Sequence, residues 1–160
     1  GAAPVLALQK QTRRRWRTHM TTGKIAVVYI GLIRPPRRFV IHRKLASDRE
    51  IFEVYKPPTL YDFISQLLTV LSSTCSDFMS RVAALDDKQF QESKHKTRRY
   101  VAERRDLLYI SSEHLAEKHS KQVLGYWVAT NIGHKEVSTI ASFACQAAGV
   151  SRKSISKLQL

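Results

Sequence analysis

The stretch KIAVVYIGLIRPPRRFVIHRK, residues 24–44, decides the fold. It contains two runs rich in β-branched and aromatic residues, separated by Arg-Pro-Pro-Arg at positions 34–37. Proline cannot donate to a strand ladder, so the proline pair forces a turn, and the two runs predict strands on either side of it. The apolar run at 25–33 has nine residues, whereas a membrane span needs about 20. This run is therefore predicted to be a buried strand and not a membrane anchor.

A third strand and a helix are predicted next. Residues 48–56 have strand character. Thr59, followed three residues later by Asp62, forms an N-capping pattern ahead of apolar residues at helical spacing, so a helix is expected from about residue 59 to 72. Further apolar residues leave an extension of this helix to residue 84 open.

Two more helical segments are predicted in the second half of the chain. Residues 86–106 are highly charged with few apolar positions, which indicates an exposed helix or a linker. Residues 111–133 begin with serines and end at Gly133, as helices commonly do. The side chains expected to face inward from this second segment are Leu115, Val123, Leu124, Trp127 and Val128.

The charge of the chain is strongly uneven. Of its 160 residues, 27 are Lys or Arg and 13 are Asp or Glu, which gives a formal net charge of +14. Residues 1–47 hold eleven of these bases and no acid. An acid-free basic segment joined to an ordinary globular composition is typical of proteins that bind a polyanion, most often nucleic acid and less often an anionic membrane surface.

The first 24 residues have no sustained helical or strand period and are predicted to form a basic arm. Its bases surround Trp16, and they are Lys10, Arg13, Arg14, Arg15 and Arg17. Such bases neutralise phosphates while a tryptophan stacks on a nucleobase; a solvated tail or a targeting remnant is the alternative. The arginines of the proline turn, Arg34, Arg37 and Arg38, are expected either to contact the same ligand or to be solubilising charges.

The last stretch, STIASFACQAAGVSRKSISKL at 138–158, has its own pattern. It predicts a helix to about Ala147, a sharp turn at Gly149, where glycine tolerates positive φ, and a second helix from Ser151 or Arg152. Ile155 and Leu158 would then face inward. A polar and basic face suited to phosphates and base edges would be left outside, formed by Arg152, Lys153, Ser154, Ser156 and Lys157.

This last stretch resembles the helix-turn-helix motif of lactose-repressor-type regulators, which has the same run of small residue, Gly, Val, Ser and a later Ser followed by a basic residue. A looser resemblance extends back through KQVLGYW at 121–127 and Gly133 to the C-terminal DNA-binding domain of the DnaA replication initiator. The resemblance implies that the second helix reads DNA. Ala144 and Cys145 depart from the large aliphatic residue and alanine usual in the first helix, and a helix ending in Ala-Ala-Gly before a capped turn also occurs in many other folds.

Patterns for catalysis or metal binding are weak. The histidines lack metal-ligand spacing, and Cys75 and Cys145 form no CxxC pair. The carboxylate pairs at 86–87 and at 113 and 117 are interpreted as helix-start and surface charges rather than as the metal ligands of a nuclease. We therefore expect no enzyme, no metal site and no cofactor.

Together these patterns predict an α+β protein: a basic N-terminal arm at 1–24, a small antiparallel sheet plus a helix at 25–85, a charged helix or linker at 86–106, and a helical region at 107–160. Three or four helices are expected in all, the last two forming the helix-turn-helix. The predicted function is nucleic-acid binding in regulation, replication or packaging, with DNA favoured over RNA. A structural RNA-binding protein, such as a ribosomal component, and a viral coat or nucleocapsid subunit are the alternatives.

The predicted partner is thus a nucleic acid, with no membrane span and with a homo-oligomer allowed. The cytoplasm or nucleoid is the expected location, and an organellar matrix is the alternative. The residues predicted to bind nucleic acid are Lys10, Arg13, Arg14, Arg15, Trp16, Arg17, Arg34, Arg37, Arg38, Ser151, Arg152, Lys153, Ser154, Ser156 and Lys157.

Overall fold

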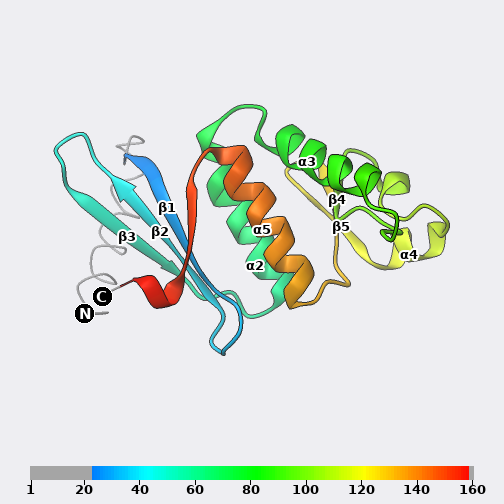
Figure 1. The fold of residues 1–160 in the computed structure, drawn as a ribbon, viewed down its shortest axis with the longest axis horizontal. Coiled ribbons are helices and arrows are strands. Elements are labelled where there is room, and N and C mark those ends of the chain that lie inside the picture. The colour runs from blue at the N-terminus through cyan, green and yellow to red at the C-terminus, as the bar shows by residue number, and fades with distance from the viewer. Residues whose placement is uncertain (1–22, 159–160) are drawn as a thin grey trace. The chain divides into compact units, whose positions relative to one another are not determined.

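The computed structural model describes residues 23–158 (Figure 1). These residues form two compact units. The sheet unit consists of the described residues up to Pro58 together with those from Gly149 on, and the helical unit is Thr59–Ala148. Helices and sheets are both present, which confirms the predicted α+β class. The sequence-based boundaries at 85 and 106 both fall inside the helical unit. The sheet unit is discontinuous in sequence because the end of the chain returns to the first strands.

The sheet unit is built on four strands, in the order β3-β2-β1-β7. The three predicted strands are confirmed as β1 (Lys24–Gly31), β2 (Arg38–Lys44) and β3 (Glu50–Tyr55), and neighbours among them are antiparallel. The strand β7 (Ser151–Ser154) runs parallel to β1. The predicted buried strand ends at Gly31, so Leu32 and Ile33 belong to the following loop.

One face of this sheet is apolar at its centre. Val28, Phe39 and Ile41 are fully buried, and the register places them on the same face because paired residues of neighbouring strands share a side. The ring of Phe39 stacks on that of its β3 partner Tyr55, with centroids 4.6 Å apart. These contacts hold the hairpin that carries the proline turn.

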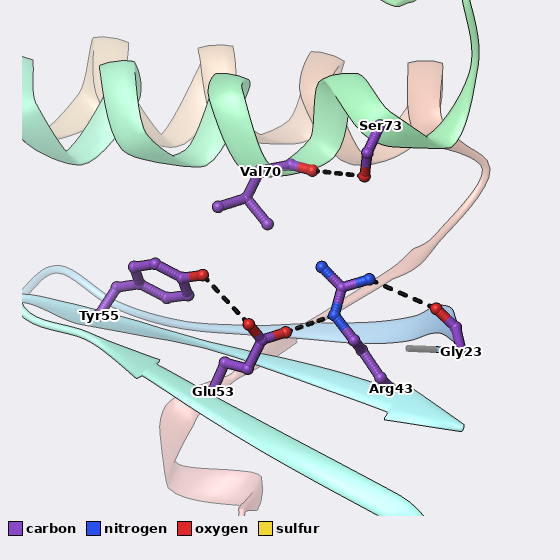
Figure 2. Close-up of polar contacts among 6 residues, drawn as sticks. All are labelled: Gly23, Arg43, Glu53, Tyr55, Val70 and Ser73. Carbon is purple, nitrogen blue, oxygen red and sulfur yellow. Dashed lines mark hydrogen bonds and ion pairs between the residues drawn. The ribbon is translucent and has the colours of Figure 1, made fainter. Parts of the chain in front are cut away.

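A buried ion pair lies on the same face (Figure 2). The Glu53 carboxylate accepts a hydrogen bond from Arg43 Nε and a longer one, 3.3 Å, from the Tyr55 hydroxyl. Arg43 Nη1 also donates to the Gly23 carbonyl at 3.4 Å. Burial raises the pKa of the Glu53 carboxyl, while Arg43 and Tyr55 act in the lowering direction. The pair crosslinks β2 and β3 away from water.

The helical unit contains three long helices: α2 (Leu60–Leu71), α3 (Phe78–Glu92) and α5 (His134–Ala148). Thr59 caps α2 as predicted, since its Oγ1 accepts the Asp62 N–H at 3.0 Å. The extension of α2 to residue 84 is not formed. A short η1 turn (Ser72–Thr74) ends it, with Ser73 Oγ donating to the Val70 carbonyl at 3.0 Å (Figure 2). Both α2 and α3 pack against α5.

A small antiparallel sheet, ordered β4-β6-β5, is formed by parts of two segments for which helices were expected, the first with a linker as the alternative. The segment at 86–106 is helical only to Glu92, and β4 (Val101–Ala102) lies within that range, followed by the η2 turn (Arg105–Leu107). The expected helix at 111–133 is helical only in α4 (Glu113–Lys118) and then forms the hairpin of β5 (Ser120–Val123) and β6 (Tyr126–Ala129).

The hairpin forms because the run VLGYWVA favours strands more than its local helical spacing favours a helix. Leu124 and Gly125 both have positive φ, 52° and 82°, as a tight two-residue hairpin turn requires. Val123 and Val128 are buried as predicted, but Leu115 and Leu124 are exposed and not inward-facing.

The predicted helix-turn-helix geometry is wrong in its second half. Helix α5 ends at Ala148 and Gly149 has φ of 69°, both as expected. The following residues form strand β7 and then the short η3 turn (Ile155–Lys157). Pairing with β7 satisfies backbone groups of β1 that would otherwise lie at a sheet edge. This long-range pairing overrides the local capping pattern.

Candidate nucleic-acid interface

The predicted contact residues are divided by the structure into two groups. Those of the arm, at positions 10 and 13–17, lie outside the described residues. All the others belong to the sheet unit. The segment predicted to be a base-reading helix is a strand and a short turn, so side chains at 151–157 do not share one helical face.

Positive charge is concentrated in the sheet unit. Its described residues hold eleven Lys and Arg against three acids, whereas the helical unit holds eleven against ten. Three of the eleven bases in the sheet unit come from the end of the chain, at 152, 153 and 157. The β7 pairing therefore unites two basic stretches that are separated in sequence by a nearly neutral unit.

The geometry of the sheet collects several of these bases at one end. Strands β1 and β7 run parallel and both finish there. The loop at 32–37 follows β1 and leads into β2, whose first residue Arg38 pairs with Gly31. Strand β3 also finishes at this end, because Tyr55 pairs with Phe39, and Lys56 follows it. This basic end of the sheet consists of Arg34, Arg37, Arg38, Lys56 and Lys157, together with Ser154 and Ser156.

The η3 turn is fixed against this end by close packing. A Cβ atom on Gly31 would lie only 2.8 Å from Ile155 Cγ2, so the absence of a side chain at position 31 lets η3 approach β1. Ser154 caps η3, because its Oγ accepts the Ser156 N–H at 3.4 Å, and the two serine hydroxyls lie 3.0 Å apart. Lys157 is exposed in the last position of this turn. The structure thus brings together the predicted residues of the proline turn and those of the chain end.

The remaining residues of β7 alternate between the two faces of the sheet. Lys153 pairs with Tyr29, which shares a face with Gly31 and its partner Arg38. Lys153 is exposed and Tyr29 half-buried, so a base, an aromatic ring and a second base occupy one face. Ser151 is on that face as well, and Arg152 and Ser154 are on the opposite one.

Four bases of the basic end are not neutralised by acids. Within residues 23–158, Arg34, Arg38, Lys56 and Lys157 form no ion pair. Of the three acids in the sheet unit, Glu53 is bonded to the buried Arg43. Glu50 Oε1 lies 3.2 Å from His42 Nε2, without the alignment of a hydrogen bond. The exposed positive charge of this end therefore remains available to an anionic ligand.

The helical unit has the opposite character. Arg99 bonds Asp87 at 2.8 Å, Arg104 bonds Asp106 at 3.1 Å, and Arg105 lies 3.8 Å from Glu117. Arg98 donates to the Asn131 carbonyl at 2.9 Å and to the Tyr109 hydroxyl at 3.1 Å. Arg99, Arg104 and Arg105 are therefore each paired with an acid of the same unit.

The two adjacent carboxylates at 86 and 87 are held in structural contacts. Asp86 is fully buried on α3, and its Oδ2 accepts the backbone N–H groups of Tyr100 at 2.6 Å and Val101 at 2.8 Å. Burial raises the pKa of the Asp86 carboxyl, while the two N–H groups act to lower it. Asp86 and Asp87 therefore point to different partners and do not form a carboxylate pair. Residues 23–158 contain no cluster of three or more His, Cys, Asp or Glu side chains suited to a metal ion.

Two exposed residues at or beside the basic end of the sheet were not identified from the sequence. Lys56 was overlooked because only strand pairing places it beside Arg38. Ile33 was assigned to the buried strand, yet its side chain is 90% exposed in the loop. Its position between Gly31 and the proline pair is the signal that could have assigned it to the turn.

No helix among residues 23–158 is both long and apolar enough to cross a membrane. No family model, curated protein or solved structure matches this chain. Its function is therefore inferred from its own residues.

Proposed function

We propose that this chain binds nucleic acid through contacts of the sheet unit with the phosphate backbone. The observation that supports this most is the gathering of unneutralised bases at one end of the sheet, contributed by the β1–β2 loop, the residue after β3 and the η3 turn. A polyanion is the ligand that such an arrangement favours.

The residue types suit phosphate. Arginine presents a planar fork that can donate two hydrogen bonds to phosphate oxygens, and lysine adds a compact charge. The hydroxyls of Ser154 and Ser156 are exposed beside Lys157, and hydroxyls also donate to phosphates. Contacts of this kind give affinity and orientation without reading sequence. We therefore expect a weak preference between sequences in place of the operator recognition implied by a helix-turn-helix.

The first prediction tests the basic end directly. Replacing Arg34, Arg38, Lys56 and Lys157 by Gln removes four phosphate contacts. Each contact contributes roughly 0.9 to the slope of log affinity against log salt for duplex DNA, so the slope should become shallower by about 3 to 4. The measurement is fluorescence anisotropy with duplex DNA, and in parallel with structured RNA, over a series of salt concentrations.

A matched control removes the same charge from the helical unit, by changing the exposed Lys88, Lys94, Lys118 and Lys135 to Gln. This variant should keep the slope of the unaltered chain. Equal losses in the two variants would mean that only net charge matters and would overturn the proposed site. Failure of the unaltered chain to bind either nucleic acid would overturn the function.

A further inference from the structure

The tip of the β1–β2 hairpin exposes an aliphatic side chain. Ile33 is 90% exposed, more than any other large apolar residue at 23–158; Ile110 follows at 63% and Leu124 at 49%. A single exposed apolar residue is common on protein surfaces, so exposure alone does not identify a contact. The chemistry of its neighbours distinguishes this position.

Ile33 is followed in the sequence by arginines and prolines. Arg34, Pro35 and Pro36 are all exposed, and Arg38 is exposed where β2 begins. Neither Arg34 nor Arg38 has an acidic partner within the described ranges. Proline fixes its own φ and restricts the preceding residue, so a tip with two prolines loses little conformational freedom on binding. An exposed apolar side chain is thus followed closely by exposed positive charges on a stiff loop.

The base of the tip is held firmly. The β1–β2 ladder continues to the pair Gly31–Arg38. On its other side β1 pairs with β7, and Ile155 packs against Gly31. Ile33 therefore projects only two residues beyond a point that is fixed from both sides.

This arrangement matches a known way of binding duplex DNA. Minor-groove proteins insert an apolar side chain between base pairs and kink the helix, while basic side chains occupy the groove or hold its phosphates. A two-stranded ribbon is narrow, and arginine is attracted by the strong negative potential of a narrow minor groove. We propose that residues 33–38 form a minor-groove wedge, in which Ile33 inserts at a base step and Arg34 and Arg38 bind the groove walls. This proposal rests on the proposed function and names duplex DNA as its ligand.

Duplex DNA fits the tip better than RNA or a membrane does. The minor groove of A-form RNA is wide and shallow, and it lacks the narrow walls that would hold a ribbon. One aliphatic side chain is also a weak anchor in a bilayer, where stable attachment needs several apolar groups or a second signal. Pyrimidine–purine steps in DNA unstack readily, so a wedge should prefer duplexes that contain them.

The test compares the full chain with Ile33→Ser and with the matched control Ile110→Ser, which removes the next most exposed apolar side chain. The probe is a duplex of about 30 base pairs with a central TA step, which is easily unstacked. It carries a fluorescent adenine analogue at that step and a donor–acceptor pair at its ends. The analogue brightens on unstacking, and energy transfer rises when the duplex bends.

The unaltered chain and Ile110→Ser should brighten the analogue and raise energy transfer. Ile33→Ser should bind roughly tenfold more weakly, as expected for the loss of one buried aliphatic side chain, and should give neither signal. Salt-dependent binding of all three proteins without either signal would overturn the wedge and leave phosphate binding intact. Failure to bind duplex DNA, or Ile33-dependent binding to phosphatidylserine vesicles in place of DNA, would overturn the wedge. The proposed function would fall with it only if the unaltered chain also failed to bind structured RNA.

Discussion

At the scale of single residues, two buried carboxylates show how polar groups are accommodated in each unit. Glu53 is bonded to Arg43 between strands, and Asp86 accepts two backbone N–H groups from the β4 region. Both groups have a raised pKa, with burial as the largest cause. A buried carboxylate is tolerated where its hydrogen bonds are made. Loss of the hydrogen bonds of either carboxylate should therefore destabilise the unit that contains it.

Asp86 provides a stability prediction. Asp86→Ala leaves the N–H groups of Tyr100 and Val101 without an acceptor and should lower the free energy of unfolding by roughly 2–4 kcal/mol. Asp86→Asn keeps one accepting oxygen and should lose clearly less. Urea denaturation at neutral pH measures both variants. Equal losses in the two variants would show that the hydrogen bonds to β4 are not the stabilising feature.

The pH dependence of stability follows from the direction of the shift at the same residue. Because the pKa of Asp86 is raised in the folded chain from its ordinary 3.8, the unfolded chain loses its proton first as pH rises. The contribution of the Asp86 carboxyl to the stability of the fold is therefore full below about pH 4. It is lost as pH rises through the pKa that this carboxyl has in the folded chain. As pH increases from 4, the unaltered chain should therefore lose stability relative to the Asp86→Asn variant. A difference that moves the other way would contradict the raised pKa.

At the scale of elements, the end of the chain is joined to β1 through the pairing of β7 and the packing of the η3 turn. Gly31→Ala would place a Cβ 2.8 Å from Ile155 Cγ2, and crowding of this kind typically costs about 1–3 kcal/mol. Ile155→Ala removes the crowding atom, so the double variant should recover most of the stability lost by Gly31→Ala. The comparison is made by urea denaturation of the two single variants and the double variant. Additive losses would show that η3 does not pack on β1.

The elements that could be predicted are those specified by neighbouring residues. The β1–β2 hairpin followed from two strand-forming runs around a proline pair, the start of α2 from the Thr59 cap, and the end of α5 from Gly149. The β5–β6 hairpin was missed although its strands are neighbours, because apolar residues at helical spacing were given more weight than the turn at Leu124 and Gly125. Strand β7 pairs with β1, far along the chain, and local spacing could not reveal that partner.

The candidate site, too, could be predicted only in the parts that neighbouring residues specify. The arginines of the proline turn were identified as candidate contacts from their place at that turn. Arg34 and Arg37 lie in the loop, and Arg38 begins β2. Their proximity to Lys56 and Lys157 required the register of three strands. A basic surface assembled from separate stretches is therefore visible in the sequence only as charge and becomes a site only with the topology.

At the scale of the whole molecule, the described residues carry most of their excess positive charge in the sheet unit and little of it in the helical unit. The helical unit has a net charge of +1, because its eleven bases face ten acids, and several of them are ion-paired. The described part of the sheet unit has a net charge of +8. Self-repulsion at this density destabilises a compact state unless anions compensate for it. Binding of a polyanion to the sheet unit should therefore also stabilise it, since a ligand of the folded state alone shifts unfolding.

Hydrogen exchange with mass spectrometry, in the presence and absence of duplex DNA, tests the central claim most directly. Amide exchange should slow on DNA binding in peptides that cover the β1–β2 loop and residues 150–158. Peptides from 59–148 should exchange at unchanged rates. Protection confined to the helical unit, while the chain is demonstrably bound to DNA, would contradict the assignment of the interface to the sheet unit.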